Sequence, residues 1–234
     1  MKTNLVVKDN ALINASYNLE VSEQRLILLS IVRARETGQG ISENVRLHIH
    51  ASDYAKQFNT TNETAYEVLK SAAENLFNRQ FSYKEQDDNG KEFVIKSRWV
   101  SQIAYAEKHA ELHIIFAPAV VPLITRLEKH FTSYEMKQLA HVTSKYGVRI
   151  YELIIQWRDV GKTPVLEIDD FRFKLGIEPH EYKQMGHFKS RVLEPAIKQI
   201  NEFTDIKVEY LQHKSGRTIT GFEFKFKLKN QPPK

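Results

Sequence analysis

The spacing of apolar residues in the last third of the chain predicts an amphipathic helix over residues 187–201. At roughly 100° per residue, Phe188, Val192 and Leu193 fall on one side of this helix. The opposite side carries long and mostly basic side chains, namely Lys183, His187, Ser190, Arg191, Glu194 and Lys198. Such a helix can pack its apolar back on a core while its polar face reaches base edges and phosphates. An ordinary solvated helix face shows the same pattern, so further observations are needed to choose.

The first half of the chain alternates between helical and strand-like patterns. After a short strand or loose arm, the expected elements are a buried helix from Ser22, a strand at 45–50, a small helix capped by Ser52 and Asp53, a helix at 63–78 capped by residues 60–62, a hairpin turning at Asn89-Gly90, and a strand at 112–116. Asn-Gly between two alternating runs is a strong hairpin signal, and the second strand is expected to run from Phe93 to Tyr105. Residues 117–130 contain two prolines and predict a connector with a short helical piece.

The second half of the chain repeats this order. The expected elements are a helical segment through Met136, Leu139 and Val142, a helix from Ser144, a strand at 166–168, a small helix capped by Asp169 and Asp170, the helix at 187–201, and strands at 206–211 and 218–228. Pro195 lacks a backbone N–H group, so it should kink the helix at 187–201 or loosen its first half.

The two halves also match residue by residue. A shift of 124 positions places Val68, Leu69, Ala72 and Leu76 on Val192, Leu193, Ala196 and Ile200. Each half then reads helix, short strand, helix, helix and β-hairpin, which is the order of a winged helix. The predicted fold is therefore α+β, with two tandem winged-helix domains over residues 1–130 and 131–234.

Composition sets the broad class of the protein. The chain has 234 residues, of which 41% are hydrophobic and 27% charged, a balance typical of globular proteins. It contains no cysteine, which fits a reducing compartment. Its first residues lack the long apolar stretch of a signal peptide, and no run approaches the roughly 20 apolar residues of a membrane span. These features predict a soluble cytoplasmic protein.

The net charge of +5 is concentrated at one end of the chain. Residues 183–234 contain 11 Lys and Arg against 5 Asp and Glu, whereas residues 1–133 contain 16 of each. A local basic surface attracts polyanions such as nucleic acid or an anionic membrane. The basic segment lacks an aromatic-rich face that would lie in a membrane, so nucleic acid is favoured.

The two copies differ on their exposed faces. At the offset of 124, His187, Ser190 and Arg191 correspond to Glu63, Tyr66 and Glu67. A carboxylate in place of Arg191 would repel phosphate and cannot donate a hydrogen bond to guanine. The C-terminal copy is therefore expected to be the main DNA reader, and the N-terminal copy to contribute less contact or mainly protein association.

Three segments resemble a known family. These are 19–28 (LEVSEQRLIL), 144–153 (SKYGVRIYEL) and 188–196 (FKSRVLEPA), and the likeness spans roughly residues 5–228. They are similar to the iteron-binding plasmid replication initiators with two winged-helix domains. The resemblance implies binding to direct repeats at a plasmid origin, help in opening it, and recruitment of host replication proteins, including the replicative helicase and the host initiator. It also implies a monomer–dimer equilibrium in which dimers, joined through the N-terminal domain, repress their own promoter.

Further candidate DNA contacts lie outside the polar face of the helix at 187–201. Lys189 is, with Ser190 and Arg191, one of the leading candidates for contact with bases or phosphates, although its angle lies near the apolar side of the helix. Lys207, Lys214 and Arg217 are on the last hairpin, where edge lysines can also serve only to discourage aggregation. Lys145 and Arg149 are one helical turn apart on the helix from Ser144. Arg149 matches an arginine of the family motif, although a salt bridge to Glu152 would explain it equally well.

His48-Ile49-His50 suggests an alternative function, that of a DNA-nicking enzyme. A His-x-His pair on a strand places both imidazoles on one face, as in rolling-circle nicking enzymes, which attack DNA with a tyrosine. The equivalent strand in the second half carries Glu167 and Asp169 instead, so two exposed histidines are the simpler interpretation. Other catalytic, zinc and phosphate-loop motifs are missing from the sequence. We expect no enzyme activity, cofactor or metal; a plain transcription repressor remains a further alternative.

Overall fold

The computed structural model describes residues 4–42, 44–125 and 130–230, which form two compact units. One unit holds the chain up to Ala140, except for Ser16–Asn18, and the other holds Ser16–Asn18 and the chain from His141. The division therefore lies ten residues beyond the expected position near 130. The reason is that strand β7 (Phe131–Glu135) pairs along its whole length with β1 (Leu5–Asp9) of the first unit.

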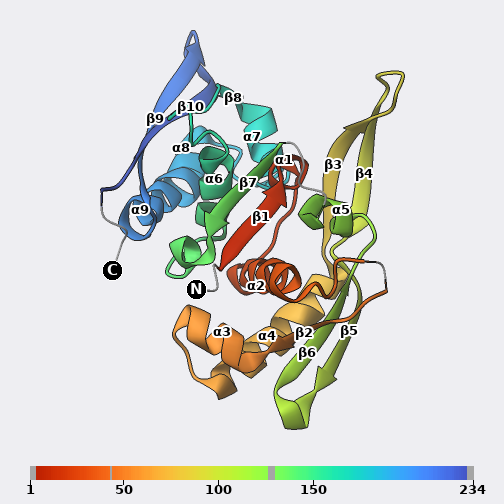
Figure 1. Ribbon diagram of the computed structural model, residues 1–234. Helices are drawn as coiled ribbons and strands as arrows, with labels where there is room; N and C mark the ends of the chain where they lie inside the picture. The colour runs from red at the N-terminus through yellow and green to blue at the C-terminus, as the bar shows by residue number, and fades with distance from the viewer. Residues whose placement is uncertain (1–3, 43, 126–129, 231–234) are drawn as a thin grey trace. The chain divides into compact units, whose positions relative to one another are not determined.

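Figure 1 shows the α-helices of the first unit. They are α1 (Asn10–Asn14), α2 (Val21–Thr37), α3 (Ala51–Phe58), α4 (Asn62–Asn78) and α5 (Val120–Thr125). A capping box between Glu20 and Glu23 begins α2, and Gly38 ends it in the left-handed conformation. The Thr61 side chain accepts a hydrogen bond from the backbone of Thr64 and caps α4, as its sequence predicts.

A three-stranded antiparallel sheet and a separate hairpin complete the first unit. The strands are β2 (Leu47–His50), β3 (Gln80–Gln86), β4 (Glu92–Arg98), β5 (Val100–Ala106) and β6 (Glu111–Phe116). The sheet has the order β2-β6-β5, whereas β3 and β4 pair only with each other. The single strand expected from Phe93 to Tyr105 is wrong, because the chain leaves one sheet and enters the other at Trp99, whose side chain is fully buried.

Two further local predictions are corrected. The helical segment expected through Met136, Leu139 and Val142 is only a short 3-10 turn, η2 (Met136–Leu139), and strand β7 leads directly into it. The residue that caps α3 is His50, so Ser52 and Asp53 lie inside the first turn instead of before it. Short apolar runs suit either element type, so pairing with a distant strand decides between them.

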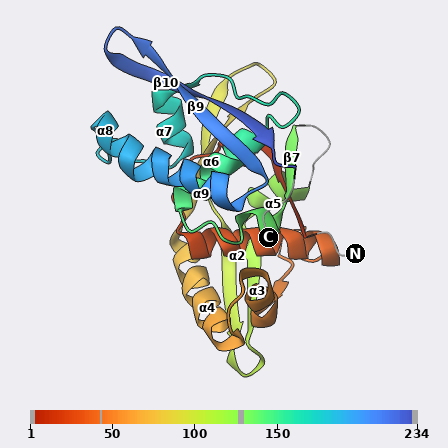
Figure 2. The ribbon, with the colours of Figure 1, turned by 90° about the vertical axis from the view of Figure 1, so that its left-hand side faces the viewer.

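Asp169 and Asp170 do not cap the small helix that follows the strand at 166–167, because they lie inside its first turn and Glu167 is its N-cap. The elements of the second unit otherwise follow the expected order. They are α6 (Lys145–Ile155), β8 (Leu166–Glu167), α7 (Ile168–Lys174), α8 (Met185–Phe188), the π-helical turn η3 (Lys189–Leu193), α9 (Glu194–Phe203), β9 (Ile206–Ser215) and β10 (Thr218–Leu228). The strand order is β8-β10-β9. Figure 2 shows α8 and α9 as one nearly continuous rod beside the long β9–β10 hairpin.

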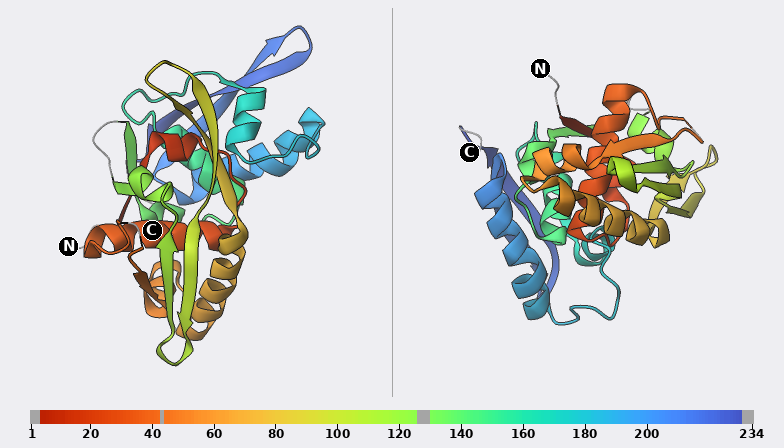
Figure 3. Two further views of the ribbon diagram at one scale, coloured as in Figure 1. Left: turned by 90° about the vertical axis from the view of Figure 1, so that its right-hand side faces the viewer. Right: turned by 90° about the horizontal axis from the view of Figure 1, so that it is seen from below.

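The two sheets have the same topology, which confirms the tandem winged-helix prediction. In the first unit β2 pairs with β6, which also pairs with β5, and in the second unit β8 pairs with β10, which also pairs with β9. Figure 3 shows α4 along the β5–β6 ribbon, the place that α9 takes beside β9 and β10 in the second unit. The wing of the first unit is therefore β5–β6. Hairpin β3–β4, which carries the Asn-Gly turn, is an insertion.

Among the residues that the structure describes, no helix is both long and apolar enough to cross a membrane.

Candidate nucleic-acid interface

Buried aromatic side chains fix the position of the α8–α9 helix. Phe188 is fully buried, with ring centroids 5.9 Å from Phe171 of α7 and 6.0 Å from Phe222 of β10. Val192, Leu193, Ala196 and Ile200 continue this buried stripe along the helix. Close packing of this kind leaves little freedom for the helix to rotate, so the opposite face is held toward solvent.

The loop before α8 is held by an arginine that sequence reasoning missed. Arg172 of α7 donates hydrogen bonds to the carbonyl oxygens of Tyr182 at 3.1 Å and Glu181 at 2.5 Å. Its guanidinium carbon also lies 5.7 Å from the centroid of the Phe188 ring. At the start of this loop Gly176 has a positive φ of 64°, and a β-carbon there would lie 2.2 Å from the Tyr17 carbonyl oxygen. Both features set where the helix begins.

Pro195 changes the helix in the way its sequence predicts. It lies at the start of α9, and the five residues Lys189–Leu193 immediately before α9 form a π-helical turn. In this turn the backbone N–H of Glu194 donates to the carbonyl oxygen of Lys189, five residues earlier. A proline ring clashes with the carbonyl four residues before it, and a wider turn relieves that clash. Arg191, whose side chain is exposed, is the middle residue of this turn.

The predicted polar face of the helix is exposed. The residues concerned are Lys183, His187, Ser190, Arg191, Glu194 and Lys198. Lys183, His187 and Arg191 also line one shallow hollow together with residues of the preceding loop. A guanidinium with open solvent around it can reach a guanine edge or a phosphate, which a buried one cannot.

Lys189 is less available than its neighbours. Its ammonium group lies 3.9 Å from a carboxylate oxygen of Glu194 and 5.9 Å from the centroid of the Tyr210 ring, and its side chain is 26% exposed. The Tyr210 hydroxyl donates to the same Glu194 oxygen over 3.5 Å. The Lys189 ammonium group is therefore directed toward Glu194 and β9, whereas the Glu194 side chain itself remains 53% exposed.

The three candidates on the last hairpin fall into two groups. Lys214 and Arg217 flank the turn at the tip of β9–β10, and both are exposed. Lys207 pairs with Lys227 near the other end of the hairpin. Seven residues of extended chain separate Lys207 from Lys214, about 23 Å along the strand. Only Lys214 and Arg217 can act together at the wing tip.

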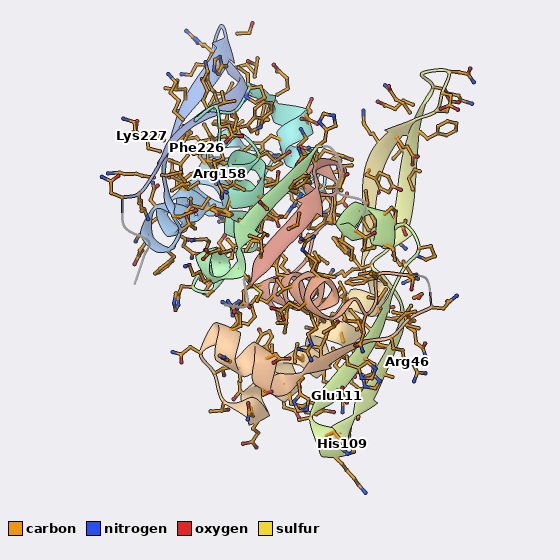
Figure 4. All side chains as sticks on the ribbon, in the orientation of Figure 1. Arg46, His109, Glu111, Arg158, Phe226 and Lys227 are labelled. Carbon is orange, nitrogen blue, oxygen red and sulfur yellow. The ribbon has the colours of Figure 1, made fainter. Side chains whose placement is uncertain are left out.

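Lys207 belongs to a basic groove that sequence reasoning missed. The groove is lined by Val160, Gly161, Lys162, Lys207, Glu209, Lys225, Phe226, Lys227, Leu228, Lys229 and Asn230. Figure 4 labels Phe226 and Lys227 at this end of the hairpin. The alternation of Lys225, Lys227 and Lys229 is visible in the sequence and places basic side chains on one face of the strand. Strand pairing was needed to show that Lys162 and Lys207 lie beside them. Lys229 donates to two carbonyls at the end of α9, and burial lowers its pKa.

Arg149 is removed from the candidate DNA contacts. Its side chain is only 2% exposed and forms a 2.9 Å salt bridge with Glu152, which is fully buried. The guanidinium lies 3.8 Å from the centroid of the Tyr17 ring, donates to the Tyr17 hydroxyl and donates to the Lys174 carbonyl. Burial raises the pKa of the Tyr17 hydroxyl. Of the two readings left open by the sequence, the salt bridge is correct. Lys145 is half-buried and donates to Asn18 at 2.9 Å.

The matching face of α4 in the first unit is not basic. Glu63 and Glu67 are exposed at the positions equivalent to His187 and Arg191. The ammonium group of Lys70, one turn later, lies 2.9 Å from the Glu107 carboxylate. The structure therefore keeps the charge difference between the two copies that the sequence predicts.

His48 and His50 of the first unit contact different partners. His48 lies opposite His113 of β6, and its Nδ1 atom is 3.0 Å from the Glu111 carboxylate. His50 is instead 3.3 Å from the Ser52 hydroxyl. Burial raises the pKa of Glu111, but hydrogen bonds with His113 and His48 outweigh this and lower it overall.

Comparison with known proteins supports the two-domain reading. A family model described as initiator replication protein, WH1, matches residues 5–155, and one described as initiator Rep protein, WH2, matches residues 167–226. A replication initiation protein of Escherichia coli is 26% identical over 234 residues, covering 97% of this chain and 71% of its own length.

Two solved structures are also similar. The WH1 domain of MSBI1.176, a replication protein isolated from a multiple sclerosis patient, is 62% identical, covers 55% of this chain and 97% of its own, and has a TM-score of 0.44. The Pi initiator protein in complex with iteron DNA has a TM-score of 0.72 at 20% identity, covering 99% of this chain and 100% of its own. The second likeness extends over both winged-helix domains. The chain therefore belongs to the initiator replication protein family and carries its WH1 and WH2 domains.

Proposed function

We propose that this protein starts plasmid replication by binding short direct repeats in duplex DNA at the origin. The observation that carries the proposal is the exposed basic face of α8–α9, which the buried Phe171, Phe188 and Phe222 hold in place. Membership of the initiator family and the fold shared with Pi, whose structure contains iteron DNA, support it.

The contacts divide by chemistry. Arg191 and its exposed neighbours on the helix donate to base edges in the major groove, while Lys214 and Arg217 at the wing tip contact phosphates. Phosphate contacts supply most of the affinity and release bound counterions, so binding weakens as salt rises. Sequence specificity comes from the contacts of the helix with base edges and from the energy needed to bend the DNA, which differs between DNA sequences.

A gel-shift titration on the DNA next to the gene tests the proposal. We expect a ladder of shifted bands that counts the repeats, competed by the same repeats but not by scrambled duplex. Band intensity should fall steeply as salt rises. Equal competition by scrambled DNA would reject the proposal.

The first domain is proposed to serve association, with secondary DNA contact. Its α4 face carries Glu63 and Glu67, which favours protein contact over phosphate contact. In this scheme dimers joined through the first domain repress their own promoter in the cytoplasm, and monomers open the origin and recruit the host initiator and the replicative helicase. Analytical ultracentrifugation of the full chain tests the dimer, and pull-down with purified helicase tests recruitment.

We further propose that the protein acts by binding, without cutting DNA. The His48 and His50 side chains have different partners, Glu111 and Ser52. Tyr105 of β5, which is separated from β2 by β6, lies on the opposite face of the sheet, where its hydroxyl donates to the Lys70 carbonyl at 3.4 Å. Supercoiled origin DNA incubated with the protein and Mg²⁺ or Mn²⁺ should stay intact. A nick lost in a His48→Ala variant would contradict this. A plain repressor would bind the repeats without melting the origin.

A further inference from the structure

Three potential metal ligands gather on the outer face of the first domain's sheet. His48 of β2 pairs directly with His113 of β6, and their rings lie 4.0 Å apart. Glu111 reaches both histidines, with one carboxylate oxygen 3.0 Å from His48 Nδ1 and the other 3.3 Å from His113 Nε2. The ligand atoms all lie within 4.8 Å of one another.

The alternation of the strands holds this cluster in place. Leu47 and Ile49 of β2 and Leu112 and Ile114 of β6 are buried on the inner face. The intervening side chains must therefore lie on the outer face. There β5 places Ala104 opposite His113 and Ala106 opposite Glu111. Both alanine side chains are small, and the Nε2 atom of His113 is itself buried. Figure 4 labels Glu111 close to the turn that ends β5.

The geometry suits a borderline divalent metal. Zn²⁺ binds imidazole nitrogen and carboxylate oxygen at about 2.0–2.1 Å in a tetrahedral arrangement, so two ligand atoms lie roughly 3.3 Å apart. The observed nitrogen–oxygen distances of 3.0 and 3.3 Å, one to each oxygen of Glu111, are close to that spacing. A single Glu111 oxygen lies within 4.8 Å of both nitrogens, so small side-chain movements bring all three ligand atoms to the ion. The three side chains are 19–44% exposed, so an ion can enter while the ligands stay oriented.

We propose that His48, Glu111 and His113 bind one Zn²⁺ ion through Nδ1, a carboxylate oxygen and Nε2, with water as the fourth ligand. The ion would link β2 to β6 at the end of the first domain's wing. His50, which lies on the same strand face but contacts Ser52, takes no part.

Isothermal titration of the untagged full-length chain with Zn²⁺ tests the proposal. We expect one ion per chain and, with Co²⁺ as a spectroscopic probe, the visible absorption of a tetrahedral nitrogen–oxygen site. His113→Ala should weaken Zn²⁺ binding by at least the roughly 10- to 100-fold that loss of an outer-shell partner costs. The matched control His50→Ala should bind Zn²⁺ like the parent, as should His109→Ala.

Thermal unfolding gives a second readout. A ligand that binds only the folded state stabilises it, so Zn²⁺ should raise Tm for the parent and for His50→Ala but not for His113→Ala. If His113→Ala does not fold, Glu111→Gln replaces it, because its side chain keeps the same size. Absence of saturable binding, or equal losses in the His50→Ala or His109→Ala controls, would overturn the proposal.

Discussion

Arg149 and Arg191 both carry a guanidinium in the second domain, and the packing around each decides what it can contact. Arg149 is enclosed by Tyr17, Glu152 and the end of α7, whereas Arg191 is exposed above the π-helical turn. Residue type and spacing alone do not separate these two outcomes. The difference arises because Ser16–Asn18, far away in the sequence, joins the second domain and covers Arg149.

Removing Glu152 should destabilise the second domain. Glu152→Gln leaves the buried Arg149 without its carboxylate, and breaking a buried ion pair typically costs about 3–5 kcal/mol. Chemical denaturation of the full chain should show this loss. A control change in an exposed ion pair, Lys84→Ala, should alter stability by less than about 1 kcal/mol. Similar losses in the two variants would contradict the assigned role of Arg149.

At the scale of elements, apolar periodicity and capping residues predicted most helices well. Thr61 and Ser144 cap α4 and α6 at the expected positions. The strands were harder, because a strong Asn-Gly turn marked β3–β4 although the wing is β5–β6. Which hairpin joins a sheet depends on non-local pairing, here with β2, and a turn motif contains no information about that partner.

The wing tip should contribute affinity without sequence preference. Replacing Lys214 and Arg217 together by Ala should weaken binding to repeats and to scrambled DNA alike. Affinity falls as salt rises, and losing one contact between a cation and a phosphate reduces the steepness of log affinity against log salt by roughly one. Fluorescence anisotropy at several salt concentrations measures this slope.

Lys207→Ala is the matched control within the same hairpin, since Lys207 lies at the opposite end from the tip. It should leave the slope unchanged. A slope that falls with Lys207→Ala and not with the tip variant would place the DNA along the basic groove instead.

The π-helical turn before Pro195 should tune how Arg191 is presented. Pro195→Ala removes the clash that favours the wider turn, so the helix can regain regular hydrogen bonds. We expect thermal stability to be kept or increased while specific DNA affinity falls. Circular dichroism and anisotropy measure the two effects. Unchanged specificity in a stabilised variant would show that the turn serves packing alone.

At the scale of the whole molecule, the chain consists of two copies of one fold with different surfaces. Both copies bury the same stripe, seen in Leu69 with Leu193 and in Ala72 with Ala196. Their exposed faces have diverged, with Glu67 in one and Arg191 in the other. The repeat was readable from the sequence because core positions tolerate few side chains, whereas the exposed positions are free to change with function.

The measurement that tests the account most directly compares Arg191→Ala with Glu67→Ala for binding to the direct repeats, with scrambled duplex as competitor. Arg191→Ala should lose roughly 1–3 kcal/mol of specific binding, since it removes a donor to the base edge. Both side chains are exposed, so each variant should unfold within about 0.5 kcal/mol of the parent. Glu67→Ala should bind the repeats as well as the parent does. Full specific affinity in Arg191→Ala, or a loss confined to Glu67→Ala, would contradict the claim that the second domain reads the DNA.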